Sequence, residues 1–366
     1  MKKIKLPICL LMALLMSFGA CTPADPSTNV KPDYKLWSAP ATEKIMQETT
    51  FDYSAIEQLP AINIDSAKGE YESAQIILTA KNTVSEYTVE LSDLTHSDGE
   101  TLYAKENIEL FTMMYVNVPV AYNTGANIGM YPDGVLPYAN SLEYDQNNVK
   151  EGCNQSIWFS FNTPMDQKTG IYTGTAKIIV DGESNDVPVS VRIRDLEVSS
   201  KVHSKSIFLN QWQFYIGEYE GTERMLDLYN KALIEYRLAP DKVSMDFTYD
   251  EAGAKYYADK AYDLAKDERC SNYSIPLSWN TNTGVSVPKF KIFVKALVEK
   301  SLETNFNLLE KAVCYFIDEP YATIGYDPLK ICSETFEKGK EESALETEAN
   351  VEKYLSEYPN VTEEFI

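Results

Sequence analysis

The spacing of apolar residues changes near residue 200, and this change constrains the fold of the 366-residue chain more than any other feature. Before it, apolar residues recur at every second position, as in Ile157, Phe159 and Phe161, and again over residues 189–193. A period of two with one apolar face is typical of half-buried antiparallel strands. Residues 35–200 are therefore predicted to form an antiparallel β-sandwich, with further strands at 71–80, 86–92, 107–120 and 171–180.

After about residue 205, short strand patterns alternate with helical patterns. Strands are expected at 207–215, 242–247, 272–278 and 313–317, and helices at 222–238, 251–266 and 288–305. Repeated strand–helix units favour a parallel sheet covered by helices. The multidomain chain is thus predicted to continue, over residues 205–366, as an α/β domain of the (β/α)8 barrel type. A doubly wound sheet is the alternative, because periodicity alone does not separate the two.

The second domain is short for a complete barrel. Such a barrel needs about 250 residues, whereas 161 residues follow residue 205. The acidic tail can add helices around 328–340 and 347–357, but not four more strands. We therefore expect about the first half of a barrel, either because the chain is truncated within the barrel or because the fold is reduced.

The first 21 residues have the pattern of an export signal. A basic start precedes an apolar stretch that is too short to span a membrane, and Gly19-Ala20-Cys21 follows it. Small residues before a cysteine resemble the lipobox of bacterial lipoproteins, in which Cys21 would be acylated and become the mature N-terminus. An ordinary secretory signal is the alternative. Residues 22–34 are rich in Pro, Asp, Ser and Thr and are expected to form a flexible tether.

These features place the mature chain in the cell envelope, anchored by lipid at the outer membrane or facing the periplasm. The net charge of −22 excludes nucleic acid as a natural partner, since a phosphate backbone needs a basic surface. The sequence leaves the oligomeric state and the leaflet that holds the anchor open.

The cysteines and histidines do not indicate a metal site. The cysteines after Cys21 lie far apart and lack metal-type spacing. They are Cys153, Cys270, Cys314 and Cys332. A disulfide among them is compatible with an oxidising compartment, but the sequence assigns none. His96 and His203 stand in unrelated surroundings, which argues against a zinc site or a serine triad. No metal or organic cofactor is expected.

The run KAVCYFIDEP at residues 311–320 leads an apolar strand into two adjacent acids, Asp318 and Glu319. In parallel sheets covered by helices, chemistry gathers at the carboxyl ends of the strands. Pro320 ends the strand and is expected to hold Glu319 in extended geometry. Asp318 and Glu319 are the candidate catalytic pair, and the alternative is that they start a solvated loop.

Several stretches together resemble glycoside hydrolase family 123 and relatives that carry domain of unknown function 4091. They are LWSAPATEKI at 36–45, GEYESAQIIL at 69–78, YPDGVLP at 131–137, TPMDQKTGIYTGTAKI at 163–178 and the strand ending in IDEP. The resemblance covers residues 36 to about 330 and implies a β-sandwich followed by a (β/α)8 barrel. It also implies an exo-acting β-N-acetylgalactosaminidase whose adjacent acids correspond to Asp318 and Glu319.

The resemblance implies a retaining, substrate-assisted mechanism, in which the acetamido oxygen of the sugar attacks the anomeric carbon. Glu319 would protonate the leaving oxygen and later activate water, while Asp318 would hold the acetamido N–H. Trp212 and Trp279 are candidate platforms for the sugar ring, and Asn210 is a candidate partner for its hydroxyl groups. Packing in the core or at the rim is the alternative for these three residues.

Two other readings of the chain remain open. It can be a surface glycan-binding or scaffold lipoprotein whose incomplete barrel is inactive, or a truncated gene product without a stable second domain. Sugar and linkage specificity do not follow from the sequence.

Overall fold

The computed structural model describes residues 33–48, 59–120, 128–208, 222–315, 317, 319, 324–362 and 365. The chain divides into two compact units, Met1–Glu197 and Val198–Ile366. Each unit has its own core and is described by itself. The expected signal and the acylated Cys21 lie outside the described residues, as does almost all of the tether.

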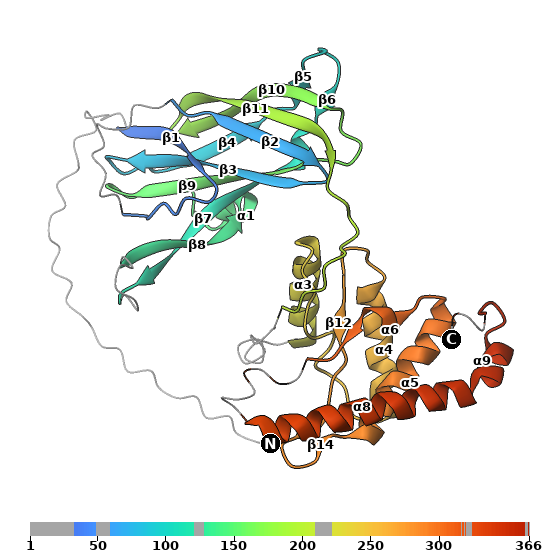
Figure 1. Ribbon diagram of the computed structural model, residues 1–366. Coiled ribbons are helices and arrows are strands. Elements are labelled where there is room, and N and C mark those ends of the chain that lie inside the picture. The colour runs from blue at the N-terminus through green and yellow to red at the C-terminus, as the bar shows by residue number, and fades with distance from the viewer. Residues whose placement is uncertain are drawn as a thin grey trace, which may run out of the picture. The chain divides into compact units, whose positions relative to one another are not determined.

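The first unit consists of two β-sheets (Figure 1). One sheet has the strand order β1 (Tyr34–Pro40), β3 (Tyr71–Ala80), β9 (Asn154–Asn162), β7 (Ile108–Val118) and β8 (Gly129–Pro137). The other has the order β2 (Ile62–Lys68), β11 (Glu183–Glu197), β10 (Gly170–Val180), β5 (Leu94–His96) and β6 (Leu102–Tyr103), and β4 (Tyr87–Leu91) also pairs with β10. The 3-10 helix η2 (Lys105–Asn107) and helix α1 (Tyr138–Glu143) lie in the connections.

The alternating residues of the sequence form the core between these sheets. Phe159 and Phe161 of β9 are completely buried, and they share one apolar cluster with Val189 and Val191 of β11. Each such side chain stabilises the fold by about 1.5–3 kcal/mol relative to an exposed one. The expected sandwich is therefore present, because one apolar face of each sheet is buried against the other.

One strand pair differs from the predicted antiparallel arrangement. β2 pairs with β11 in parallel, with Ile62 opposite Val189. The turn between β2 and β3 passes from one sheet to the other, and its Gly69 has φ 73° and donates a backbone hydrogen bond to Thr163. This turn takes the chain from the sheet of β2 to the sheet of β3, so β2 and β3 do not form a hairpin. β2 instead forms the edge of its own sheet, where it runs parallel to β11.

The second unit is mainly helical (Figure 1). Its helices are α3 (Thr222–Glu235), α4 (Glu251–Ala265), α5 (Val287–Thr304), α6 (Leu308–Lys311), α8 (Tyr326–Ala349) and α9 (Val351–Glu357). Its strands are β12 (Tyr273–Ser274), β13 (Trp279–Asn280), β14 (Gly284–Val285) and β15 (Ala312–Val313). Helices α3 and α4 fall within the predicted helical segments, and α5 begins one residue before its predicted segment of 288–305.

The predicted (β/α)8 barrel is not confirmed. Among the described residues of the second unit, parallel pairing is limited to β12 with β15 and to one bridge between Phe208 and Pro240. The strand expected at 242–247 is irregular instead. Its Met245 N–H donates to the Glu223 carboxylate and its Lys242 carbonyl accepts from Asn230, so these backbone groups bind side chains rather than a neighbouring strand.

Helices α4 and α5 build the core of the second unit. Small residues on α4, among them Ala258 and Ala261, are buried and leave room for the aromatic rings of Tyr257 and Phe293. Asp250 caps α4 by accepting a hydrogen bond of 2.8 Å from the Gly253 N–H. Within the described ranges, no helix is both long enough and apolar enough to cross a membrane.

Candidate functional site

A cavity of about 440 Å³ opens at the carboxyl ends of the short parallel strands in the second unit. Its size is within the range of small-molecule sites. The lining residues come from segment 241–257, from the residues after β12 and from the chain after β15. They are Asp241, Lys242, Ser244, Met245, Phe247, Tyr249, Tyr257, Ser274, Ile275, Pro276, Leu277, Trp279 and Tyr315.

Aromatic rings make much of the cavity wall. Phe247 packs edge-on against Tyr249 at 5.5 Å and against Tyr257 at 5.3 Å between ring centroids. Tyr257 is buried, and its hydroxyl donates a hydrogen bond to the Ser274 carbonyl. The wall is therefore anchored to β12, and it presents apolar faces of the kind on which a sugar ring stacks.

Asp241 is the carboxylate that lines this cavity. It lies one position after the bridge between Phe208 and Pro240, and its backbone N–H donates to the Phe208 carbonyl at 3.0 Å. Its Oδ1 accepts a hydrogen bond of 3.0 Å from the Ser274 hydroxyl. Burial raises the pKa of Asp241, while the Ser274 hydrogen bond and the Lys242 charge oppose that rise.

Trp279 lies on β13, in a hairpin that pairs it with Val285 of β14. It lines the cavity and also packs, partly buried, against the core cluster of the second unit. Its packing agrees with the alternative of a core or rim role, and its place in the cavity wall leaves room for a role as a sugar platform. Contact with a sugar stays a prediction.

The chain after β15 lines this cavity and then continues, in the sequence, to the predicted catalytic pair. The Ile275 N–H donates to the Val313 carbonyl at 2.8 Å, which aligns the two parallel segments, and Tyr315 lines the cavity with 38% of its surface exposed. Asp318 follows Tyr315 by three positions and lies outside the described residues.

Glu319 is exposed and has φ 44°, in the left-handed region. The extended geometry expected for this residue is therefore wrong. A non-glycine residue has a conformational cost in that region. Glu319 lies at a bend beyond the end of β15 at Val313, and side-chain patterns did not predict this bend.

The remaining predicted site residues are not placed. Trp212 and Asn210 lie outside the described residues, as does Cys21. Sequence reasoning missed Asp241, Tyr249 and Tyr315. The signal for Asp241 was a polar residue directly after a short apolar segment, at a strand end. Tyr249 and Tyr315 had no comparable signal among 25 tyrosines.

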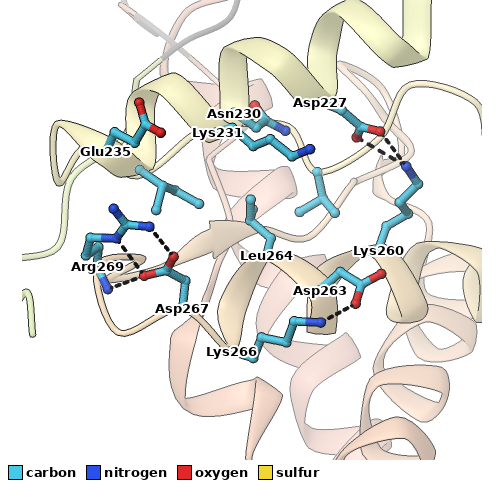
Figure 2. A pocket seen from close by; sticks show the side chains of 12 residues that line it. Asp227, Asn230, Lys231, Glu235, Lys260, Asp263, Leu264, Lys266, Asp267 and Arg269 are labelled. Atoms are coloured by element: carbon cyan, nitrogen blue, oxygen red, sulfur yellow. Dashed lines mark hydrogen bonds and ion pairs between the residues drawn. The ribbon is translucent and has the colours of Figure 1, made fainter. Parts of the chain in front are cut away.

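A second cavity, of about 550 Å³, lies between α3 and α4. Figure 2 shows that its charges face one another: Lys260 pairs with Asp227 at 3.0 Å, Lys266 with Asp263 at 2.7 Å and Arg269 with Asp267 at 2.7 Å. Because these charges are largely neutralised in place, this cavity has the character of a solvated groove between two helices.

A third cavity, of about 460 Å³, lies beside β15 between α5 and α8 and has mainly apolar walls, including Phe290, Val294 and Phe336. Polar side chains, among them Ser343, Thr347 and Glu348, line it as well. Within the described part of the chain, no group of three or more His, Cys, Asp and Glu side chains is arranged to hold a metal ion.

Comparison with known proteins bears on both units. Residues 54–180 match the sequence profile of the glycoside hydrolase 123 N-terminal domain. The structure of a family 123 glycoside hydrolase from Clostridium perfringens, solved to explain glycolipid glycan hydrolysis, matches with 15% identity and a TM-score of 0.56. The match covers 82% of this chain and 60% of that one, so this chain spans about 60% of its length.

Two fimbrial proteins also match the chain, at TM-scores too low to bear on its fold. MyfA of Yersinia enterocolitica, in complex with galactose, is 9% identical over 44% of this chain and 99% of its own, with a TM-score of 0.21. The CooA pilin of enterotoxigenic Escherichia coli is 11% identical over the same shares, 44% and 99%, with a TM-score of 0.22. No curated protein matches the sequence. The predicted resemblance to glycoside hydrolase family 123 is confirmed by the domain match and the fold likeness together.

Proposed function

We propose that this chain, which has a glycoside hydrolase 123 N-terminal domain at residues 54–180, is a glycoside hydrolase. It releases terminal β-linked N-acetylhexosamine from glycans, with N-acetylgalactosamine favoured. The cavity at the carboxyl ends of β12 and β15 is the observation that carries the proposal, since Tyr315 of its wall stands three positions before Asp318. Its aromatic wall and its size suit one sugar ring.

The mechanism that fits two adjacent acids is retaining and substrate-assisted. The acetamido oxygen of the sugar attacks the anomeric carbon, the bond to the leaving oxygen breaks, and Glu319 gives that oxygen its proton. Water then opens the oxazolinium-like ring while Glu319 takes up a proton. Asp318 accepts a hydrogen bond from the acetamido N–H and stabilises the positive charge. The positive φ of Glu319 supports this assignment, because neighbouring residues of a regular strand would face opposite ways.

The same proposal places the protein in the cell envelope, anchored by a lipid on Cys21. Its second domain then corresponds to the first part of a (β/α)8 barrel, which the parallel pairing of β12 with β15 and the bridge at Phe208 support.

A second candidate is a surface glycan-binding lipoprotein with an inactive barrel. The shortness of β12 and β15, two residues each, favours it, because short strands hold catalytic groups less rigidly than long ones.

Hydrolysis of chromogenic β-N-acetylgalactosaminide and β-N-acetylglucosaminide by residues 22–366 tests the proposal, with Glu319→Gln as the inactive control and a circular-dichroism melt to verify folding. Release of the chromophore by the unmodified chain but not by the variant is the expected result. A folded chain that releases nothing but binds the sugars is the glycan-binding protein, and the hydrolase proposal is then wrong.

A further inference from the structure

The cavity contains an acid that takes no part in the proposed bond cleavage. Asp241 lines the wall built by segment 241–257, whereas the catalytic pair follows β15. We propose that Asp241 is the specificity-determining residue of this site, which accepts hydrogen bonds from two neighbouring hydroxyl groups of the terminal sugar and thereby reads the configuration at C4. The inference rests on the proposed function, because it concerns the sugar bound in the same cavity.

The backbone next to Pro240 is held by two hydrogen bonds with Phe208. Phe208 donates its N–H to the Ala239 carbonyl at 2.9 Å, and Asp241 donates its own N–H to the Phe208 carbonyl at 3.0 Å. This pair of hydrogen bonds makes the parallel bridge with Pro240. A residue on such a support keeps its position when the cavity is empty, so little conformational freedom is lost when a ligand binds.

The side chain is fixed as well. The Ser274 hydroxyl donates to Asp241 Oδ1 at 3.0 Å, and Ser274 lies on β12, where it pairs with Val313 of β15. Tyr257 holds the Ser274 carbonyl from the buried side. The carboxylate is therefore oriented by a strand that is itself anchored in the core, and this is the preorganisation that a recognition residue needs.

An ionised carboxylate is an acceptor with about four lone-pair sites on two oxygens. Among the described residues, Ser274 is the one side chain that donates to it, through a single lone pair of Oδ1. Two adjacent sugar hydroxyls can fill the sites that face the cavity, one on each oxygen. Hydrogen bonds to a charged acceptor are stronger than neutral ones, and partial burial removes competing water.

The geometry of the sugar decides which hydroxyls these are. A terminal 2-acetamido hexose has free hydroxyls at C3, C4 and C6, because C2 bears the acetamido group and C1 the bond to be cleaved. Neighbouring pairs among these are C3 with C4 and C4 with C6, and both include C4. The C4 centre is where N-acetylgalactosamine and N-acetylglucosamine differ, so a carboxylate that binds a neighbouring pair selects between the two sugars.

The surroundings of Asp241 favour a sugar over other ligands that a carboxylate binds. Phe247, Tyr249 and Trp279 line the same cavity, so a flat C–H face has apolar surface to contact while its hydroxyls reach the acid. A metal ion would need several acidic or histidine ligands, and among the described residues no group of three or more such side chains is arranged to hold one.

The test measures binding of methyl β-N-acetylgalactosaminide and of its 3-, 4- and 6-deoxy analogues to the full chain by calorimetry. All chains carry Glu319→Gln, which prevents turnover, and circular dichroism verifies folding. Asp241→Ala and the near-isosteric Asp241→Asn are compared with Asp246→Asn, an exposed aspartate of the same segment that does not line the cavity. Loss of two charge-assisted hydrogen bonds weakens binding by at least about 10-fold in Asp241→Ala.

The deoxy analogues separate recognition from a structural role. The chain with Asp241 intact is expected to lose affinity for the 4-deoxy sugar and for one of the other two analogues, while Asp241→Ala loses no further affinity for either. The Asp241→Ala chain is also expected to lose its preference between N-acetylgalactosamine and N-acetylglucosamine. Equal losses for every analogue in both chains, or unchanged affinity in Asp241→Ala and Asp241→Asn, overturn the inference and leave the hydrolase proposal standing. If the folded chain with Glu319 intact neither binds nor hydrolyses N-acetylhexosaminides, both the inference and the hydrolase proposal are wrong.

Discussion

The Ser274 hydroxyl donates a hydrogen bond of 3.0 Å to Asp241 Oδ1 and joins two chain segments that are 33 positions apart. One segment carries the bridge of Pro240 to Phe208, and the other is β12, which pairs with β15. The contact therefore links an acid of the candidate cavity to β12, which pairs with the strand that precedes the predicted catalytic pair.

Ser274→Ala is expected to weaken sugar binding without unfolding the chain. The hydroxyl contributes one hydrogen bond to a charged group, so its loss should reduce affinity by roughly 10-fold. The pKa of Asp241 should rise further, because the Ser274 hydrogen bond lowers it. Calorimetry with methyl β-N-acetylgalactosaminide between pH 4 and 8 measures both effects. Ser204→Ala, an exposed serine of the same unit, is the control, and identical curves for both variants would contradict the role of Ser274.

Asp241→Asn is expected to stabilise the second unit at neutral pH. Burial raises the pKa of Asp241 in the folded chain, so the folded state favours the protonated acid. Stability from this group is fully present below the ordinary aspartate pKa of about 3.9, and it is lost as pH rises through the folded pKa. The amide carries no charge and escapes that loss.

Thermal melts at pH 4 and pH 7 measure this effect. The melting temperature of Asp241→Asn should exceed that of the unmodified chain at pH 7, and the difference should shrink at pH 4. Asp246→Asn should show neither change. A variant that melts lower at pH 7 would mean that the ionised acid stabilises the fold, contrary to the burial argument. A gain in stability together with a loss of affinity is typical of binding residues.

Glu319→Gln should lower kcat on N-acetylhexosaminides by about 10²–10⁴-fold, because no group remains to protonate the leaving oxygen. The loss should be smallest for substrates with dinitrophenyl leaving groups, which depart without a proton, and largest for alkyl glycosides. Steady-state kinetics on both substrate types measure the ratio. Glu334→Gln, an exposed glutamate on α8, is the control. The same loss for every leaving group would rule out an acid role for Glu319.

Cys21→Ala tests the lipid anchor in the bacterial host. The unmodified chain should fractionate with membranes and carry the mass of an acylated cysteine, whereas the variant should lack that mass and leave the membrane fraction. A matched Cys153→Ala variant should behave as the unmodified chain. Intact mass spectrometry of the purified proteins decides the outcome, and an unmodified N-terminal cysteine would refute the anchor.

The parts of the fold that local pattern controls could be predicted from the sequence. The alternation through Phe159 and Val191 identified buried strand faces, and the helical patterns identified α4 and α5 within a few residues. The parallel placement of β2 beside β11 could not be predicted, because it depends on a turn at Gly69 that passes between sheets. The irregular backbone after Pro240 could not be predicted either. There, side chains of α3 form hydrogen bonds with backbone groups that a strand would use for pairing.

Only part of the candidate site could be predicted, because the sequence shows local patterns and not long-range contacts. Trp279 was identified because an aromatic residue after a strand is visible in a single segment. Asp241 becomes a site residue only through Ser274 and Phe208, which lie far away in the sequence. Long-range contacts of this kind leave no periodic trace, so pattern reasoning identifies the strand ends but not the residues that meet there.

Phe293→Ala tests whether the aromatic wall of the cavity depends on the core behind it. Phe293 is fully buried on α5, and its ring centroid lies 5.6 Å from those of Phe247, Tyr249 and Tyr257. Removing the ring leaves a void beneath the wall, and the unfolding free energy of the second unit should fall by about 3–5 kcal/mol.

Hydrogen-exchange mass spectrometry resolves this effect by segment. Peptides from α4 and α5 should exchange faster in Phe293→Ala, while peptides from β9 of the first unit should keep their rates. Leu309→Ala, a partly exposed leucine, is the matched control and should change neither set. Sugar affinity should fall in Phe293→Ala alone, because Phe247 and Tyr249 lose the surface that fixes their orientation. Equal protection in the two variants would show that the wall is held by other contacts than those of Phe293.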